Sequence, residues 1–459
     1  MKAHEPDDSI RLMIALPLRQ WFGGNDWENA LTIVESLKPH IPHMFLFDCD
    51  IYMYGAEREF ASHVAAARKF RPNVCLSLPN AIYGMLLGKR DYYNWYSKKK
   101  TLWEHLRSFK SPTPQGDIFA GEFGMPLIML WDHLIMHAPQ FSIGSDPVPR
   151  SRSRPGCLEM LTRAVNAAQF VHYVPDSGHI EVFERLELCQ RGLLQRYTVP
   201  AHDVFLNEPV LSHDELITDR VLFAGNLNSS RVMSAFGDDP IVAEVRDYVT
   251  SIKCKEWKTA AWYAYEDIAS QKAAAGIAEL HPDHSFFWSL GRELITNVVT
   301  TAFRTTVFKS LGCPIDLYGG FTDPDYVAAL NRTGLVRSMG SVPLENLGSI
   351  YARYQFSIDI THTPFIRGSN AKVLDCFAAG GFMFVDWKED LRQVLGEIAE
   401  EFMYRSADEL NGKMDALRRC PARRKEIIQA VRERVSHDLN LTTLLLDIIR
   451  TTAQPGGVG

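Results

Sequence analysis

Several features that mark common protein classes are missing from this chain of 459 residues. Its eight cysteines form no CxxC pair and have no histidine at zinc-ligand spacing, which indicates neither a zinc site nor a disulfide scaffold. No apolar run is long enough to span a membrane, and the acidic segment at residues 1–12 lacks the apolar core of a signal peptide. We therefore expect a cytoplasmic protein without a tightly bound metal.

Other absences narrow the range of functions. The first predicted strand of each half, at Ile10 and at Val221, is not followed by GxGxxG with an acidic residue about twenty positions later, which argues against a nicotinamide cofactor. A net charge of −6 argues against general nucleic-acid binding. The aromatic and basic segment 92–110 has helical spacing and is predicted to be a solvated amphipathic helix rather than a nucleic-acid surface.

The composition is that of a globular protein, with 46% hydrophobic and 23% charged residues, and the length favours two domains of about 200 residues each. Strand and helix patterns alternate in both halves, which predicts α/β domains with doubly wound parallel sheets. The pattern loosens at residues 198–213, where we place the boundary. The predicted strands are 10–16, 44–47, 73–78, 126–131 and 170–174 in the first half, and 220–225, 315–318, 337–343, 356–360 and 382–385 in the second.

Two helical regions stand out in the second half. Residues 240–311 have almost no strand pattern, which predicts helices inserted between the first two strands of that half. Residues 422–451 predict a long final helix, broken near 436–440.

The segment 356–386 organises this half as strand, polar loop, helix, Gly-Gly and strand. Ser369 is expected to cap the helix. The free N–H groups and positive dipole end of such a helix favour a diphosphate, and Arg367 and Lys372 add positive charge. Asp375, about a turn and a half further on, is placed to accept hydrogen bonds from ribose hydroxyls. An ordinary solvated loop on an α/β unit is the alternative.

At this point the sequence resembles the GT-B glycosyltransferases, and among them the CgeB-like spore-maturation group. The segments that carry the resemblance are FAGNLNSSR at 223–231, IDLYGGF at 315–321, MGSVPLENLGSIYARYQFSIDI at 339–360, RGSNAKVLDCFAAGGFMFVD at 367–386 and FMYRSADEL at 402–410. The resemblance implies two Rossmann-like domains that face a central cleft. Residues 1–210 would bind the acceptor, residues 211–425 with their helical insertion would bind the donor, and residues 426–459 would pack back on the first domain and end in a tail.

The resemblance further implies that a nucleoside-diphosphate sugar is the donor substrate, with no tightly bound cofactor. In the second half, no DxD-type pair of carboxylates directly follows a predicted strand, so a divalent ion, if used, would be carried by the diphosphate. Many retaining relatives have a glutamate where Arg367 stands, so the transferred sugar and the stereochemistry stay open. A second departure from the family is Asn226, where many relatives have an arginine. The expected donor-binding residues are Gly225, Asn226, Arg231, Gly319, Ser341, Val342, Arg367, Gly368, Ser369, Asn370, Lys372 and Asp375.

On the acceptor side, Asp132, His133 and His137 follow a predicted strand and are the candidates for the base that deprotonates the acceptor hydroxyl, with Asp132 and His133 preferred. Asp132 as a helix cap, or His137 as an ordinary helix-turn residue, would have no such role. Gly23 and Gly24 resemble the acceptor-side loop of the family, although Gly-Gly after a strand is also an ordinary turn. The acceptor would be a glycan, a protein or a small molecule.

Two other functions share the expected fold. One is a GT-B nucleotide-sugar epimerase or phosphorylase, and the other is an inactive scaffold that keeps the fold for binding. Product analysis with and without an acceptor distinguishes the epimerase or phosphorylase from a glycosyltransferase.

Overall fold

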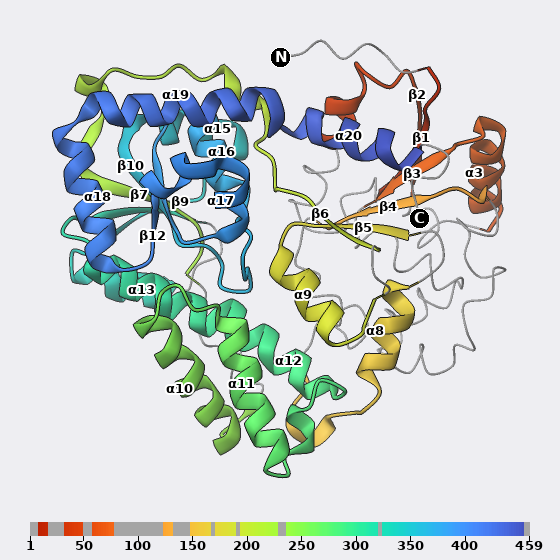
Figure 1. Ribbon diagram of the computed structural model, residues 1–459, viewed down its shortest axis with the longest axis horizontal. Helices are drawn as coiled ribbons and strands as arrows, with labels where there is room; N and C mark the ends of the chain where they lie inside the picture. Colours follow the sequence, from red (N-terminus) through yellow and green to blue (C-terminus); the bar gives the residue numbers. More distant parts are fainter. Residues whose placement is uncertain are drawn as a thin grey trace.

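The computed structural model describes residues 8–16, 32–48, 57–77, 123–131, 147–166, 170–189, 193–227, 236–319 and 324–453. These residues form two α/β domains that lie side by side, each built around a parallel sheet of six strands (Figure 1). The predicted fold class, two Rossmann-like domains with a helical insertion in the second half, is confirmed.

The first sheet has the strand order β2-β1-β3-β4-β5-β6. Strands β3 and β4 are buried at every position, as expected where helices cover both faces of a parallel sheet. The strands are β1 (Arg11–Leu16), β2 (His43–Asp48), β3 (Val74–Ser77), β4 (Leu127–Leu130), β5 (Phe170–Val174) and β6 (Leu194–Arg196). The helices described in this domain include α3 (Glu57–Phe70), α8 (Cys157–Val165) and α9 (Ser177–Arg185).

The second sheet has the order β12-β11-β10-β7-β8-β9. Its strands are β7 (Ile217–Ala224), β8 (Ile315–Tyr318), β9 (Val336–Gly340), β10 (Tyr354–Asp359), β11 (Met383–Asp386) and β12 (Met403–Tyr404). The chain runs outward from β7 to β9 and then returns to β10 on the other side of β7. This reversal creates a topological switch point between β7 and β10, where open α/β sheets bind their ligands.

The helical insertion joins β7 to β8 and consists of α10 (Pro240–Lys255), α11 (Ala261–Ala274), α12 (Ser285–Glu293), a π-helical turn (Leu294–Val299) and α13 (Thr300–Ser310). Its far end packs against the first domain, beside α8 (Figure 1). The Asp283 carboxylate accepts hydrogen bonds from Gly156 N at 3.0 Å and from Leu158 N at 3.2 Å. One apolar core is therefore continuous from the first sheet into the insertion.

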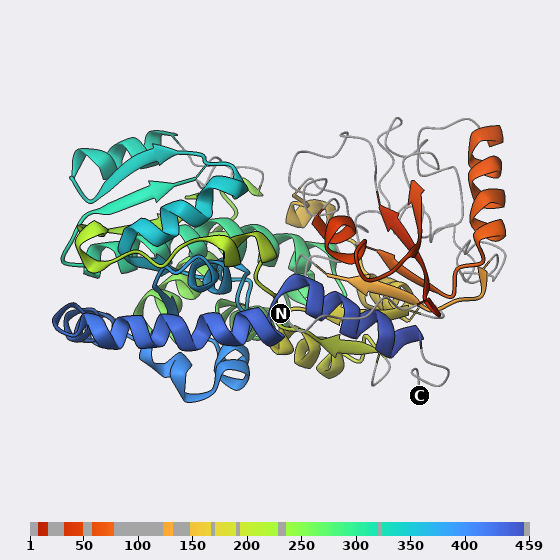
Figure 2. The same cartoon turned by 90° about the horizontal axis from the view of Figure 1, so that it is seen from above.

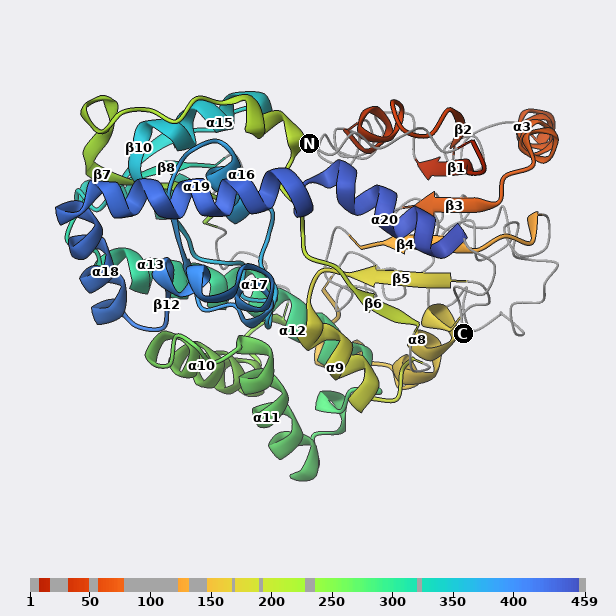
Figure 3. The ribbon, with the colours of Figure 1, turned by 45° about the horizontal axis from the view of Figure 1, so that its top comes forward.

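The remaining helices are α14 (Pro324–Arg332), α15 (Leu344–Arg353), α16 (Lys372–Ala378), α17 (Glu389–Leu395), α18 (Ala407–Arg419), α19 (Pro421–Asp438) and α20 (Leu441–Ala453). Helices α19 and α20 follow one another along one side of the molecule (Figure 2). Leu445 and Ile449 of α20 are buried together with Leu76 of β3, so α20 packs on the first sheet (Figure 3). Among the helices of the described ranges, none has the length and apolar character needed to cross a membrane.

The chain crosses between the domains at two adjacent places. Residues 197–216 lead from β6 to β7, and the junction of α19 and α20 leads back. Ala201 N donates to Leu439 O at 2.9 Å, and Leu441 N donates to Ala201 O at 3.0 Å. The two crossings are thus hydrogen-bonded to each other and form a double hinge.

One local prediction is wrong. Helix α16 does not begin after a Ser369 cap; its N-cap residue is Ala371, without a side-chain capping bond. Asn370 Oδ1 accepts a hydrogen bond from Lys372 N at 3.1 Å, so Asn370 takes the role expected of Ser369. Strands β6 and β12 were also not predicted, because segments of 3 and 2 residues are too short to produce a recognisable alternation.

Candidate functional site

The carboxyl ends of β7, β8 and β9 meet at one edge of the second sheet through glycine turns. Gly225 N donates to Tyr318 O at 2.8 Å, and Gly319 N donates to Gly340 O at 2.9 Å. A Cβ atom at Gly319 would lie 2.2 Å from Gly225 O, so the two turns approach this closely only because glycine is present. Residues predicted to bind the donor that lie along this edge are Gly225, Asn226, Gly319, Ser341 and Val342.

Two cations join the ends of β7 and β10 at the switch point. Arg304, on α13, donates to Ile360 O at 3.1 Å and to Asn226 O at 2.5 Å. Lys372, on α16, donates to Ala224 O at 2.9 Å, and 26% of its side chain remains exposed. Positive charge is therefore preorganised at the sheet edge where this fold class binds ligands.

The last residue of β10, Asp359, holds this arrangement together. It is 1% exposed, and its Oδ1 lies 3.1 Å from Lys372 Nζ. Its Oδ2 accepts hydrogen bonds from Thr361 Oγ1 at 2.9 Å and from Asn370 Nδ2 at 3.3 Å. Burial raises the pKa of Asp359, but Lys372 and Arg304 outweigh burial and lower this pKa overall. Two cations around one carboxylate leave one positive charge, which suits a phosphate oxygen.

The loop between β10 and α16 contacts the first domain. The Asp176 carboxylate, which is 0% exposed, accepts hydrogen bonds from Ile366 N at 2.7 Å and Arg367 N at 3.1 Å. The same carboxylate caps α9 by accepting from Gly178 N at 2.8 Å. Asp176 follows β5, so the carboxyl edges of the two sheets face each other across this contact.

Arg367 and Gly368 also lie at this contact between the domains. The Arg367 guanidinium lies 2.5 Å from a carboxylate oxygen of Glu181 on α9 and 3.6 Å from one of Glu389. A Cβ atom at Gly368 would lie 2.3 Å from Pro175 O. In this conformation both residues are engaged with the first domain.

Asp375 and Ser369 lie deeper. Asp375 is 2% exposed, and it accepts a hydrogen bond from His202 N at 2.8 Å while His202 Nδ1 lies 3.1 Å away. Ser369 is 8% exposed. The carboxylate expected to hold a ribose is thus bonded to the linker between the domains.

Other predicted site residues lie outside the described ranges. They are Arg231 on the donor side and Gly23, Gly24, Asp132, His133 and His137 on the acceptor side. Strand β4 ends just before Asp132, and Trp131 is described and fully buried. Their roles remain predictions.

Sequence reasoning missed three charged groups of this site: Arg304, Asp359 and Asp176. Each is at most 5% exposed. A usable signal was present for one of them, because Asp359 ends an apolar strand and a buried charge needs partners. Within the described residues, no group of three or more His, Cys, Asp or Glu side chains is arranged to hold a metal ion.

A comparison with known protein families concerns the second half of the chain. Residues 301–445 match the protein-family model described as "Glycosyl transferase-like", a segment that runs from α13 into α20 and contains Arg304, Asp359 and Lys372. This part of the chain is therefore similar to glycosyl transferases, and the predicted GT-B arrangement of two Rossmann-like domains is the one observed. No curated protein matches the sequence.

Three solved structures with similar folds cover nearly the whole chain. Sucrose-phosphate synthase from Thermosynechococcus elongatus is 12% identical, with a TM-score of 0.46 over 96% of this chain and 97% of that one. Anabaena Alr3699/HepE in complex with UDP and glucose is 10% identical, with a TM-score of 0.48 over 96% and 98%. T4 phage BGT in complex with UDP and Mn²⁺ is 10% identical, with a TM-score of 0.41 over 97% and 99%.

Proposed function

We propose that this protein transfers a sugar from a nucleoside-diphosphate sugar to an acceptor hydroxyl. The observation that carries the proposal is the pair of cations, the buried Arg304 and the partly exposed Lys372, at the switch point of the half that is similar to glycosyl transferases. Negative charge builds on the diphosphate as the sugar departs. Preorganised cations in a crevice largely shielded from water stabilise that charge.

In this proposal the donor binds residues 211–425. Its diphosphate lies against Lys372 and the glycine turns at Gly225 and Gly319, with the base along Ser341 and Val342. Protein cations neutralise the diphosphate, so no metal held by the protein is needed. Donor binding in this proposal requires that two contacts open. The Arg367 side chain reaches the diphosphate only after its ion pair with Glu181 breaks, and Asp375 reaches a ribose only after its hydrogen bond from His202 breaks.

The acceptor binds residues 1–210, with Asp132 or His133 as the base. The loop that follows β10 already touches the start of α9 through Asp176. A reaction between substrates held by the two facing edges would be shielded from water by this contact, which limits hydrolysis of the donor.

The first test is direct binding. Titration calorimetry with UDP, GDP and ADP should give a dissociation constant in the micromolar range for one of them. UDP is tested first, because two of the similar structures contain it. Incubation of the matching nucleotide sugars with and without candidate acceptors, followed by mass spectrometry, should show a glycosylated acceptor and free nucleoside diphosphate. A sugar epimerised without acceptor would replace this proposal with the epimerase alternative, and no binding of any diphosphate would overturn it.

A further inference from the structure

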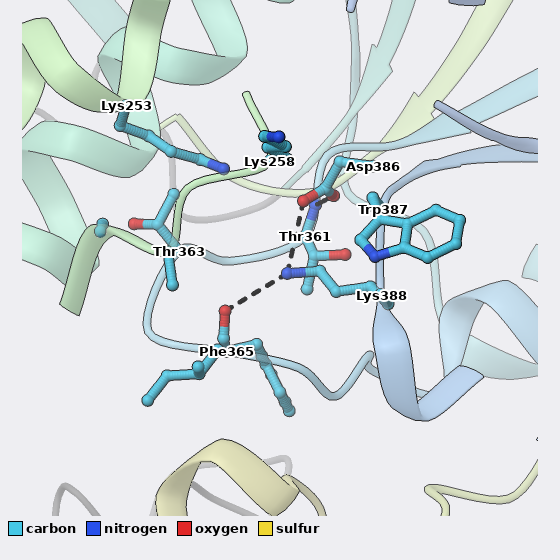
Figure 4. Close-up of a pocket in the computed structure, with 11 residues that line it drawn as sticks. Lys253, Lys258, Thr361, Thr363, Phe365, Asp386, Trp387 and Lys388 are labelled. Atoms are coloured by element: carbon cyan, nitrogen blue, oxygen red, sulfur yellow. Dashed lines mark hydrogen bonds and ion pairs between the residues drawn. The ribbon is translucent and has the colours of Figure 1, made fainter. Parts of the chain in front are cut away.

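A second cluster of cations lies beside the proposed donor site. Lysines from separate segments line a polar cavity of about 10 Å³, room for about one water molecule, between the helical insertion and the ends of β10 and β11 (Figure 4). Its charged lining residues are Lys253, Lys258, Lys388 and Asp386.

Most of these charges are buried. Lys253 is 5% exposed, Lys388 is 4% exposed and Asp386 is 2% exposed. Lys388 Nζ lies 3.3 Å from Asp386 Oδ2, its ion-pair partner. Lys258 is exposed and has no ion-pair partner among the residues that the structure describes. The lining contains three ammonium groups and one carboxylate, so two of its positive charges are not compensated within it.

The buried ammonium groups have few partners. Lys253 Nζ donates to Trp257 O and lies 4.2 Å from the centre of the Phe303 ring. Lys388 Nζ donates to Phe365 O at 3.3 Å, the second dashed line from this residue in Figure 4. Burial lowers the pKa of Lys253 to about 8, because keeping this amine charged away from water costs free energy. An anion bound here would reduce that cost.

The lysine cluster adjoins the proposed diphosphate site. Thr361 joins the two, because its N–H donates to Asp386 Oδ1 at 2.7 Å and its hydroxyl donates to Asp359 Oδ2 at 2.9 Å. These carboxylates end neighbouring parallel strands, which are about 4.8 Å apart. The cluster therefore lies one strand further along the same sheet edge than Lys372.

We propose that Lys253, Lys258 and Lys388 bind an anionic substituent, a carboxylate, on the sugar of the donor, with one carboxylate oxygen taking the space of the single water molecule for which the cavity has room. This inference rests on the proposed function and deepens it, because it assigns the donor to the class of nucleotide uronic acids. Every residue that lines the cavity lies between positions 253 and 388, on the donor side, so the cluster serves the donor rather than the acceptor. The sugar is bonded directly to the diphosphate, and a neighbouring strand end is the place its outer substituents reach.

The test compares charged and neutral donors by titration calorimetry, without turnover. UDP, GDP and ADP are each titrated alone, as the neutral hexose conjugate and as the corresponding uronic acid, for example UDP-glucose and UDP-glucuronic acid. With the base that binds, the wild-type protein should bind the uronic acid about tenfold more tightly than the neutral sugar. Lys253→Met and Lys388→Met should remove most of this preference while changing the affinity for the diphosphate alone by less than about twofold.

Lys258→Gln provides a variant on an exposed side chain that leaves the core intact, and it should reduce the preference by about threefold. Lys255→Gln, at the exposed end of α10 and away from the cavity, is the matched control and should retain the wild-type preference. Equal binding of uronic acid and neutral sugar by the wild-type protein overturns the inference alone. The same holds if the lysine variants weaken the diphosphate as much as the uronic acid, which would place the lysines on the diphosphate. Failure of all three diphosphates to bind overturns the proposed function itself.

Discussion

His202 Nδ1 lies 3.1 Å from both carboxylate oxygens of Asp375, and this pair connects the linker between the domains to helix α16. The neighbouring residue, Ala201, bridges to Asn440 at the junction of α19 and α20. The ion pair therefore lies at the double hinge, where a change of charge acts on both crossings of the chain.

This pair predicts a pH-dependent stability. Burial lowers the pKa of His202, but Asp375 and Asp203 outweigh burial and raise this pKa overall. Because the folded value lies above the unfolded value of about 6.5, the stabilisation is complete below about pH 6.5 and is lost as the pH rises through the folded pKa. The melting temperature of the wild-type protein should exceed that of His202→Gln at pH 6, and this difference should shrink towards pH 8.5. The exposed His437→Gln is the control, and a difference that is constant over this range would contradict the assignment.

Lys372→Met should weaken binding of the cognate nucleoside diphosphate by about 10- to 100-fold, because a charge-assisted hydrogen bond in a closed site is worth about 1.5–3 kcal/mol. It should also destabilise the fold, because Asp359 loses its ion-pair partner. Lys372→Met combined with Asp359→Asn should recover stability but not affinity, which separates the two effects. Calorimetry and urea unfolding measure them, with the exposed Lys425→Met as control. Wild-type affinity in Lys372→Met would remove the diphosphate from this position.

Arg304→Met should lower the free energy of unfolding by about 3 kcal/mol, because the change breaks a buried charged network and leaves the carbonyls of Ile360 and Asn226 without this donor. Urea denaturation gives the value. Arg246→Met, on the outer side of α10, should stay within about 0.5 kcal/mol of the wild-type protein. Equal stability of Arg304→Met and wild type would show that the ends of β7 and β10 are held without this arginine.

Arg367 and Glu181 should affect nucleotide binding in opposite directions. Glu181→Gln releases the guanidinium from α9, so the affinity for the diphosphate should rise by about threefold, whereas Arg367→Gln should lower it by about threefold. Glu184→Gln, on an exposed position of the same helix, is the control. If Glu181→Gln and Arg367→Gln both leave the affinity unchanged, Arg367 serves only the contact between the domains.

Some strands were predictable from the local pattern of apolar residues alone. Residues 170–174 and 315–318 form strands β5 and β8 with the predicted bounds, because short apolar runs between turns leave few alternatives. The start of α16 was not predictable in the same way. Ser369 and Asn370 are both good cap residues, and the choice between them depends on contacts with Asp359 and with the first domain, which are distant in sequence.

The sequence by itself determined that there are two α/β halves, that a helical region interrupts the second, and that a loop with Lys372 follows a buried strand. Local periodicity and turn residues specify these features, because they depend on neighbours within a few positions. Only the tertiary structure decided where the buried charged groups find their partners. Arg304 and Ile360 are 56 positions apart, and Asp176 and Ile366 are 190 positions apart. Such pairs form because buried charges and backbone N–H groups must find partners once water is excluded, and the fold supplies those partners from distant segments.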